Sequence, residues 1–231
     1  MSLVEDYTEA VEEIFNQKWD TRDGKKVPEP EDLRLGNDAV QLNGTVLYAD
    51  LDASTNLVDS YKPGFAAKIY KAYLSCAAKV IRSEGGVITS YDGDRIMAVY
   101  IGNSKNSSAA QSALKINYTV TQIINPILKK YYPDTSYRVR QVVGIDTSDL
   151  FVARTGIRGS NDLVWVGRAA NYAAKLCSLS PDYPSWITET AYNRLNDAAK
   201  YSSDGKLMWE AVTWNNMYGM KVYRSTWWRR V

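Results

Sequence analysis

Hydrophobic residues recur along the chain with helical spacing in some stretches and with strand spacing in others. Residues 4–19 place five apolar side chains on one helical stripe, namely Val4, Tyr7, Val11, Ile14 and Phe15. This pattern predicts an amphipathic helix with an acidic outer face. The next stretch, 20–43, is polar with several prolines and aspartates, and it predicts a linker or a wrapping arm. We therefore expect an N-terminal helix and arm over residues 1–44 and one folded domain over 45–231.

The folded domain is predicted to begin with a buried strand, because 45–51 is a short apolar run with Asp50 near its end. An interrupted helical stretch follows, broken at Pro63 and capped at its end by Gly85-Gly86. Asp92-Gly93-Asp94 then separates two extended segments, which is typical of a hairpin. The full set of later elements is predicted as strands at 87–91 and 95–101, a helix at 107–131, a strand pair at 137–146 and 149–153, a helix at 167–180, a strand at 185–188, a helix at 189–199 and edge strands beyond 206.

The order of these elements indicates the fold class. Strands alternate with helices, and two of the strand groups are hairpins, which favour antiparallel pairing. The pattern predicts an α+β fold, a ferredoxin-like sandwich with additions, in which helices lie on one side of a largely antiparallel sheet.

Composition limits the possible partners. The chain has 231 residues, 45% of them hydrophobic and 23% charged, which suits one well-buried domain. A net charge of +2 gives no indication of a nucleic-acid groove or of an anionic membrane partner, so we expect neither. No run of eighteen apolar residues occurs, and the N-terminus is acidic and unlike a signal peptide. We expect a soluble, cytoplasmic protein.

The absence of histidine restricts the chemistry. With no histidine in the chain, Ser-His and Cys-His catalysis and zinc-histidine sites are excluded. Cys76 and Cys177 lie in apolar, helix-like stretches and suit the core of a reduced protein. A catalytic metal would have to be held by carboxylates and carbonyls, which favours Mg²⁺ or Mn²⁺.

Two aspartates at strand ends carry the candidate chemistry. Asp50 ends the first buried strand, and Asp94 lies at the tip of the predicted hairpin. If these strands are neighbours, the two carboxylates converge at one edge of the sheet, and a cation relieves their repulsion. Such a pair can hold two metals about 3.5–4 Å apart for an in-line phosphoryl transfer. The alternative is that Asp50 caps the following helix and Asp94 is only a turn residue.

Four segments together resemble the catalytic domain of class III adenylate and guanylate cyclases. They appear in the family's order and span roughly residues 45–200. The segments are 46–55 with Asp50, 85–100 with Asp94, 143–147, and the helical segment 166–176. The resemblance implies a nucleotide cyclase catalytic domain that acts on a nucleoside triphosphate.

The resemblance also implies roles for individual residues. Asp50, Asp94 and the Leu51 carbonyl would bind two divalent cations, Mn²⁺ or Mg²⁺. The turn into the next helix would bind phosphates through the backbone N–H groups of Ala53, Ser54 and Thr55. By itself this turn is a weak indication, because many strand-to-helix turns look the same.

The helical segment 166–176 would supply the remaining catalytic residues. Asn171 would position the ribose, and Lys175, one helical turn later, would meet the α-phosphate. The family has arginine at that position, and lysine keeps the charge but loses the planar fork. The resemblance implies that these two side chains and the metal site come from opposite subunits of a C₂ homodimer.

Departures from the family concentrate in the base pocket. Ser90 stands where purine cyclases have a lysine, and Val164 where they have aspartate or threonine. A pocket without these groups loses the selectivity that they supply. Three interpretations remain: a pyrimidine cyclase, a purine cyclase with different contacts, or a catalytically inactive nucleotide-binding sensor. A palm-type polymerase would share the two carboxylates but would also need a basic groove.

The whole pattern is similar to the pyrimidine cyclases of bacterial Pycsar anti-phage systems. The similarity includes the N-terminal arm at 19–24 and the segment 167–172. It implies synthesis of cyclic UMP or cyclic CMP as an alarm signal for a separate cyclic-nucleotide effector. We expect UTP as the substrate on the likeness of the whole sequence, with CTP as the alternative.

Overall fold

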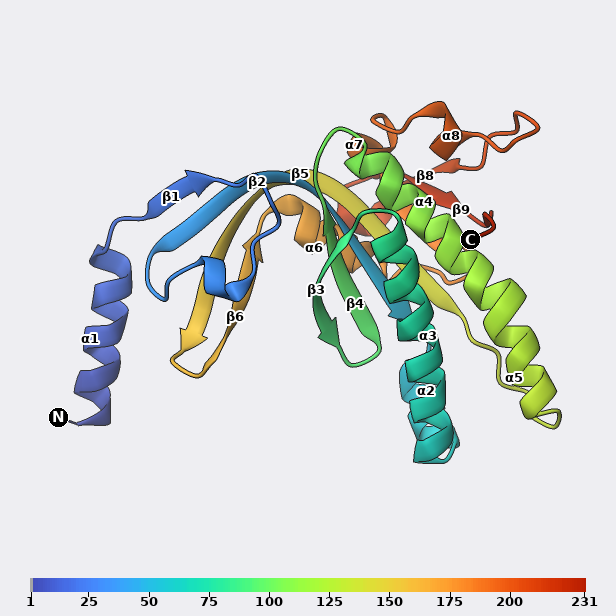
Figure 1. Ribbon diagram of the computed structural model, residues 1–231, viewed down its shortest axis with the longest axis horizontal. Coiled ribbons are helices and arrows are strands. Elements are labelled where there is room, and N and C mark those ends of the chain that lie inside the picture. The colour runs from blue at the N-terminus through green and yellow to red at the C-terminus, as the bar shows by residue number, and fades with distance from the viewer. Residues whose placement is uncertain (1) are drawn as a thin grey trace. The chain divides into compact units, whose positions relative to one another are not determined.

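The computed structural model describes residues 2–231, which form two compact units. The first unit contains the chain up to Asn43 together with Asp149–Gly167, and the second contains Gly44–Ser148 and Arg168–Val231. Two long strands, β2 (Asp38–Leu51) and β5 (Gln141–Ile157), contribute to both units (Figure 1). The domain limits expected from the sequence stay a prediction.

The first unit contains the predicted amphipathic helix, α1 (Leu3–Asn16), which begins at a capping box formed by Ser2 and Glu5. The stretch expected to be a linker is partly strand. In this stretch β1 (Asp20–Asp23) pairs in parallel with the first residues of β2, and η1 (Pro30–Asp32) is a short 3₁₀ turn. The prediction of a linker or a wrapping arm did not include these strands, which burial of Ala39, Val40 and Leu42 stabilises.

The sheet of the second unit is built mainly from antiparallel pairs. Its strand order is β3-β4-β2-β5-β7-β9-β8, and the β5–β7 pair is parallel. The further strands are β3 (Val87–Asp92), β4 (Arg95–Tyr100), β7 (Ser185–Thr188), β8 (Glu210–Trp214) and β9 (Met220–Ser225). The predicted α+β class with a largely antiparallel sheet is confirmed, as is the hairpin at residues 92–94.

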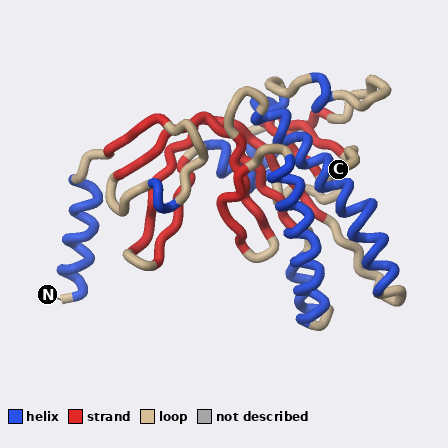
Figure 2. Tube along the Cα trace, viewed as in Figure 1, coloured by secondary structure: helices blue, strands red, loops and turns tan. Residues whose placement is uncertain are grey.

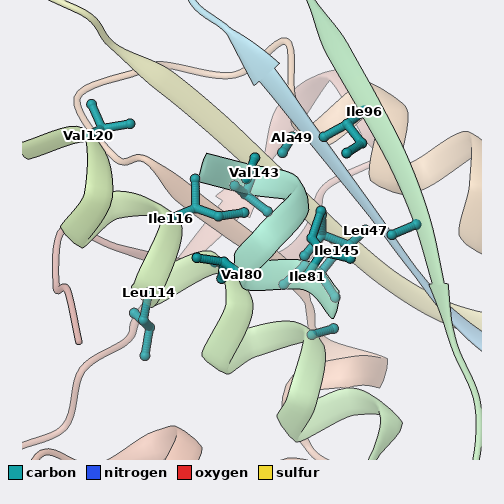
Figure 3. Packing of buried hydrophobic residues seen from close by; sticks show 14 of the residues in the cluster. Leu47, Ala49, Val80, Ile81, Ile96, Leu114, Ile116, Val120, Val143 and Ile145 are labelled. Atoms are coloured by element: carbon teal, nitrogen blue, oxygen red, sulfur yellow. The ribbon is translucent and has the colours of Figure 1, made fainter. Parts of the chain in front are cut away.

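Helices cover one face of this sheet and form the main core with it. They are α2 (Ser54–Ser60), α3 (Pro63–Ser83), α4 (Lys105–Tyr118), the π-helical segment η2 (Thr119–Ile124) and α5 (Asn125–Tyr131). Figure 2 shows α3 and the α4–α5 rod on the same side of the strands. Alternate strand residues such as Leu47, Ala49, Val143 and Ile145 meet Ile81 and Ile116 in the core (Figure 3).

The predicted helix at 107–131 is continuous but changes its hydrogen-bond register. Pro126 lacks an N–H and would clash with the carbonyl of Gln122 in a regular α-helix. The chain instead forms the π-helical turns of η2, in which the Asn125 N–H bonds to the carbonyl of Val120, five residues back.

The opposite face of the sheet carries α6 (Arg168–Leu176). The Val142 side chain packs with Leu176 there, while its strand neighbour Val143 faces the main core. Gly144 allows α6 to lie close to strand β5. A Cβ atom at this position would lie 2.1 Å from the Ala173 carbonyl oxygen of the helix. The expectation that helices lie on one side was therefore too simple.

Two further predictions differ from the structure. Instead of a strand pair at 137–146 and 149–153, β5 is one strand of 17 residues that turns back into β6 (Ser160–Val166). The predicted helix at 189–199 is two short helices, α7 (Glu189–Tyr192) and α8 (Asp197–Lys200), because Asn196 caps a new start. Among the described residues, no helix is both long and apolar enough to cross a bilayer.

Candidate active site

The two candidate metal-binding aspartates lie on neighbouring elements of the second unit. Asp50 is near the end of β2, and Asp94 is in the turn between β3 and β4. Strands β2 and β4 are antiparallel neighbours, and their register sets Asp50 opposite Arg95, the residue after Asp94. Because Ala49 and Leu51 face the main core, Asp50 and Tyr48 face the α6 side of the sheet.

The two carboxylates influence each other. The pKa of Asp50 is raised from 3.8 to about 6, mainly by burial and then by the negative charge of Asp94, while Arg95 opposes this rise. A carboxylate that is half-buried beside another negative charge is stabilised by a cation, as the sequence argument required.

The backbone after Asp50 turns sharply into α2. Leu51 is the last residue of β2, and the Asp52 N–H donates to the carbonyl of Arg140 at 2.9 Å. Ala53 has a left-handed backbone with φ of 55°, and α2 begins at Ser54. This turn leaves the N–H groups of residues 53–55 at the start of a helix, where backbone donors lack intrahelical partners.

Sequence reasoning did not identify Arg95, which lies between the acidic groups. Its guanidinium donates to Asp92 at 2.8 Å and lies 5.3 Å from the centre of the Tyr48 ring. Its Nε is buried and has no hydrogen-bond partner within the described residues. Its place beside the aspartates follows from the register of β2 and β4, which the sequence does not give.

The aspartate pair fits divalent cations only as part of a larger ligand set. Within residues 2–231, no group of three or more acidic, cysteine or histidine side chains forms a complete metal site. Two carboxylates and a backbone carbonyl leave coordination positions that phosphate oxygens of a substrate can fill, and Mg²⁺ commonly binds in this way.

Helix α6 is fixed firmly to the sheet. The Arg168 guanidinium donates to both carboxylate oxygens of Asp146, at 3.0 and 3.2 Å, and the Thr188 hydroxyl also donates to this fully buried carboxylate. The Ser148 hydroxyl accepts from the Ala169 N–H at 3.0 Å. These bonds hold the first turn of α6 in place.

The two catalytic candidates of α6 are exposed. Asn171 and Lys175 lie on its outer side, and Lys175 is 3.8 Å from the Met217 sulfur. Among the described residues, no hydrogen bond or ion pair links either side chain to Asp50 or Asp94. Asp50 and Asp94 therefore lie on neighbouring elements, whereas the two α6 candidates are exposed and, in the part of the chain that the structure describes, have no hydrogen bond or ion pair to them.

The two base-pocket candidates lie in different units. Ser90 is half-buried on β3, next to a bulge in its pairing with β4, and Val164 is exposed on β6. Neither side chain carries a charge. The polar pair expected of a purine cyclase is absent at both positions.

Solved structures with the same arrangement of strands and helices identify the fold. No protein-family model matches the sequence. The solved adenylyl cyclase CyaB from P. aeruginosa has the same fold, with a TM-score of 0.67 at 17% identity, over 83% of this chain and 97% of that chain. The second unit therefore has the fold of the class III nucleotide cyclase catalytic domains.

Two relatives are similar along their whole length. The uridylate cyclase of Xanthomonas perforans is 53% identical over 231 residues, which is 99% of each chain. The uridylate cyclase of Burkholderia cepacia is 54% identical over 229 residues, which is 98% of each chain. The chain belongs to the uridylate cyclase family and is a nucleotide cyclase.

Proposed function

We propose that this enzyme converts UTP to 3′,5′-cyclic UMP and pyrophosphate. The observation that carries the proposal is similarity over the full chain to proteins named uridylate cyclase. In the proposed reaction the ribose 3′ oxygen forms a bond to the α-phosphorus, the bond from that phosphorus to pyrophosphate breaks, and the hydroxyl proton leaves to solvent.

We propose that Asp50, Asp94 and the Leu51 carbonyl hold two divalent cations, Mg²⁺ or Mn²⁺. When bound, such ions supply a more acidic 3′ hydroxyl and neutralise charge on the phosphates. Support comes from the raised pKa of Asp50, since a nearby cation would keep this half-buried carboxylate ionised.

The backbone N–H groups of Ala53, Ser54 and Thr55 are proposed to bind the phosphates. Asn171 is proposed to position the ribose, and the Lys175 ammonium to offset charge that develops at the α-phosphate. Both α6 side chains are exposed and not bonded to the aspartates, which supports a homodimer in which each site combines Asp50 and Asp94 of one subunit with Asn171 and Lys175 of the other.

Ser90 and Val164 are each proposed as a base-contacting position. Neither offers the charged or strongly polar group that would pair with a purine edge, so the pocket gains no selectivity for adenine or guanine from them. Whether the pocket admits cytosine as well as uracil is decided by the product assay below.

The biological role is proposed from the same relationship. Cyclic UMP would act as a second messenger in anti-phage defence, bound by a separate cyclic-nucleotide effector protein. The enzyme would then contact its effector only through the product.

The proposal is tested by incubating the protein with each of the four ribonucleoside triphosphates and Mn²⁺, and by identifying products by mass spectrometry. We expect cyclic UMP from UTP, and no product from the Asp50→Ala or Asp94→Ala variants. Asp59→Ala, which removes an exposed carboxylate on α2, serves as the matched control and should keep full activity. Cyclic CMP or a cyclic purine nucleotide as the main product would overturn the substrate assignment. Triphosphate binding without pyrophosphate release would indicate a sensor.

A further inference from the structure

Helix α1 presents an apolar stripe that nothing in the described chain covers. Its stripe consists of Leu3, Val4, Tyr7, Val11, Ile14 and Phe15, and no residue of the helix is buried. Phe15 is 83% exposed and Tyr7 is 61% exposed. A helix of a soluble protein normally turns such a stripe toward a partner surface, so this face indicates a binding site.

The helix is anchored at its C-terminal end. The Asn37 side-chain amide donates to the carbonyls of Ile14 and Gln17, at 2.9 and 2.6 Å. The Asp20 N–H, at the start of β1, donates to the Asn37 carbonyl at 2.7 Å. These bonds tie the end of α1 to the strand that follows it, so the helix is a fixed part of the first unit.

A groove in the second unit is also apolar and uncovered. It has a volume of about 590 Å³ and runs between α3 on one side and η2 and α5 on the other. Its lining is mostly apolar and includes Ile123, Ile127 and Tyr131. Ile127 is 51% exposed and Tyr131 is 70% exposed, so this apolar lining is also uncovered.

The charges of the two surfaces are opposite. Helix α1 carries five acidic residues and no basic one. The three elements that form the groove contain no acidic residue, and Lys68 and Lys71 line it. An acidic amphipathic helix laid in this groove would bury its apolar stripe while its flanking carboxylates stay near the lysines.

The groove is shorter than helix α1 but can hold its middle turns. Helix α1 has 14 residues and is about 21 Å long. The groove side of α3 runs from Lys68 to Cys76, which is about 12 Å and accommodates the middle turns of such a helix.

We infer that α1 of one chain docks in the α3–α5 groove of a second copy of this chain. In a twofold pair each subunit gives its helix to the other, so two identical contacts form. The inference concerns assembly and does not depend on the proposed reaction, because neither surface includes a residue assigned to the active site.

A cysteine cross-link tests this contact directly. Native Cys76 lines the groove, whereas Cys177 is buried and unreactive. Val11→Cys places a thiol on the apolar stripe, and Glu12→Cys places one on the acidic side of the same helix as a matched control. Both positions are exposed, so neither variant should disturb folding. Treatment with a short bismaleimide, denaturing electrophoresis and peptide mass spectrometry then report which thiols are joined and whether they come from one chain or two.

We expect Val11→Cys to give a covalent dimer joined through Cys76, with a yield several-fold above that of Glu12→Cys. Adding Cys76→Ser should abolish this product, and raising the salt concentration should slow its formation, since the flanking charges attract. A link from position 11 to Cys76 of the same chain would overturn docking on a second copy. If the protein is dimeric by light scattering but no Cys76-dependent product forms, helix exchange is overturned. The proposed catalytic homodimer is not affected by that result.

Discussion

Asp50→Asn should stabilise the metal-free protein while it removes the response to metal. At neutral pH the wild-type protein must keep a charged carboxylate half-buried beside Asp94, and this raises the pKa of Asp50 from 3.8 to about 6. The carboxamide has nearly the same shape and no charge. Folding of the variant therefore avoids the desolvation and repulsion that the carboxylate experiences.

The size of the effect follows from linkage. A pKa of about 6 in the folded protein and 3.8 in the unfolded chain corresponds to about 3 kcal/mol above pH 6. Asp50 is only half-buried and the variant also deprives Arg95 of a nearby negative charge, so we expect a net gain of about 1 kcal/mol. For a chain of this length, that is a rise in Tm of about 2–4 °C.

The pH dependence has a definite sign. The folded-state pKa of Asp50 lies above its unfolded value. The free energy of unfolding of the wild type, compared with that of Asp50→Asn, is therefore highest below about pH 4, where Asp50 is protonated in both states. The wild type loses this stability as the pH rises from about 4 to about 6. The gain in the free energy of unfolding from Asp50→Asn should reach its full value by about pH 7.5.

Thermal unfolding measured with EDTA and then with Mn²⁺ checks both halves of the prediction. We expect Asp50→Asn to have the higher Tm in EDTA, and Mn²⁺ to raise the Tm of the wild type but not of the variant. Asp59→Asn, on an exposed surface of α2, should behave as the wild type in both conditions. A lower Tm for Asp50→Asn in EDTA, or an equal Mn²⁺ response, would refute the reasoning.

Three further outcomes are expected. Gly144→Ala should lower the free energy of unfolding in urea by about 3 kcal/mol, because its methyl group would collide with the α6 backbone; an unchanged midpoint would disprove the close contact. Arg168→Ala should lower the free energy of unfolding by about 2 kcal/mol at pH 8 and by less at pH 5, because protonation removes the charge of the buried, unpaired Asp146. Urea unfolding at both pH values measures this, and a loss independent of pH would contradict it. Mixed Asp50→Ala and Asn171→Ala chains should regain part of the cyclase activity that each lacks alone, and no recovery in proven heterodimers would favour sites within single subunits.

The sequence predicted the local elements of the candidate site well, because each had a short-range cause. An apolar run ending at Asp50 predicted a buried strand, and Asp92-Gly93 predicted the turn that carries Asp94. The two aspartates act on each other only if their strands are neighbours, and the sequence did not determine the order of the strands. The neighbouring Arg95 was missed for the same reason, since its importance comes from its register opposite Asp50.

The errors also have local causes. The sequence predicted a break between two strands at 147–148, yet β5 continues through both residues, and the Ser148 hydroxyl accepts a hydrogen bond from the Ala169 N–H of α6. This tertiary contact to α6 could not be predicted from the local sequence. The prolines and aspartates of 20–43 indicated a loop, so the strands in this stretch were not predicted. Their stability comes from the pairing of β1 with β2, which the local sequence does not indicate.

The immobility of α6 affects how such an enzyme can be regulated. With Gly144 against its backbone and Arg168 clamped to Asp146, this helix cannot tilt or slide without disrupting the sheet beneath it. If Asn171 and Lys175 complete a site in another subunit, as proposed, a regulator could act on catalysis by changing how two rigid bodies meet. Dilution would then inactivate the enzyme by dissociating its subunits, and a high local concentration of the protein would activate it.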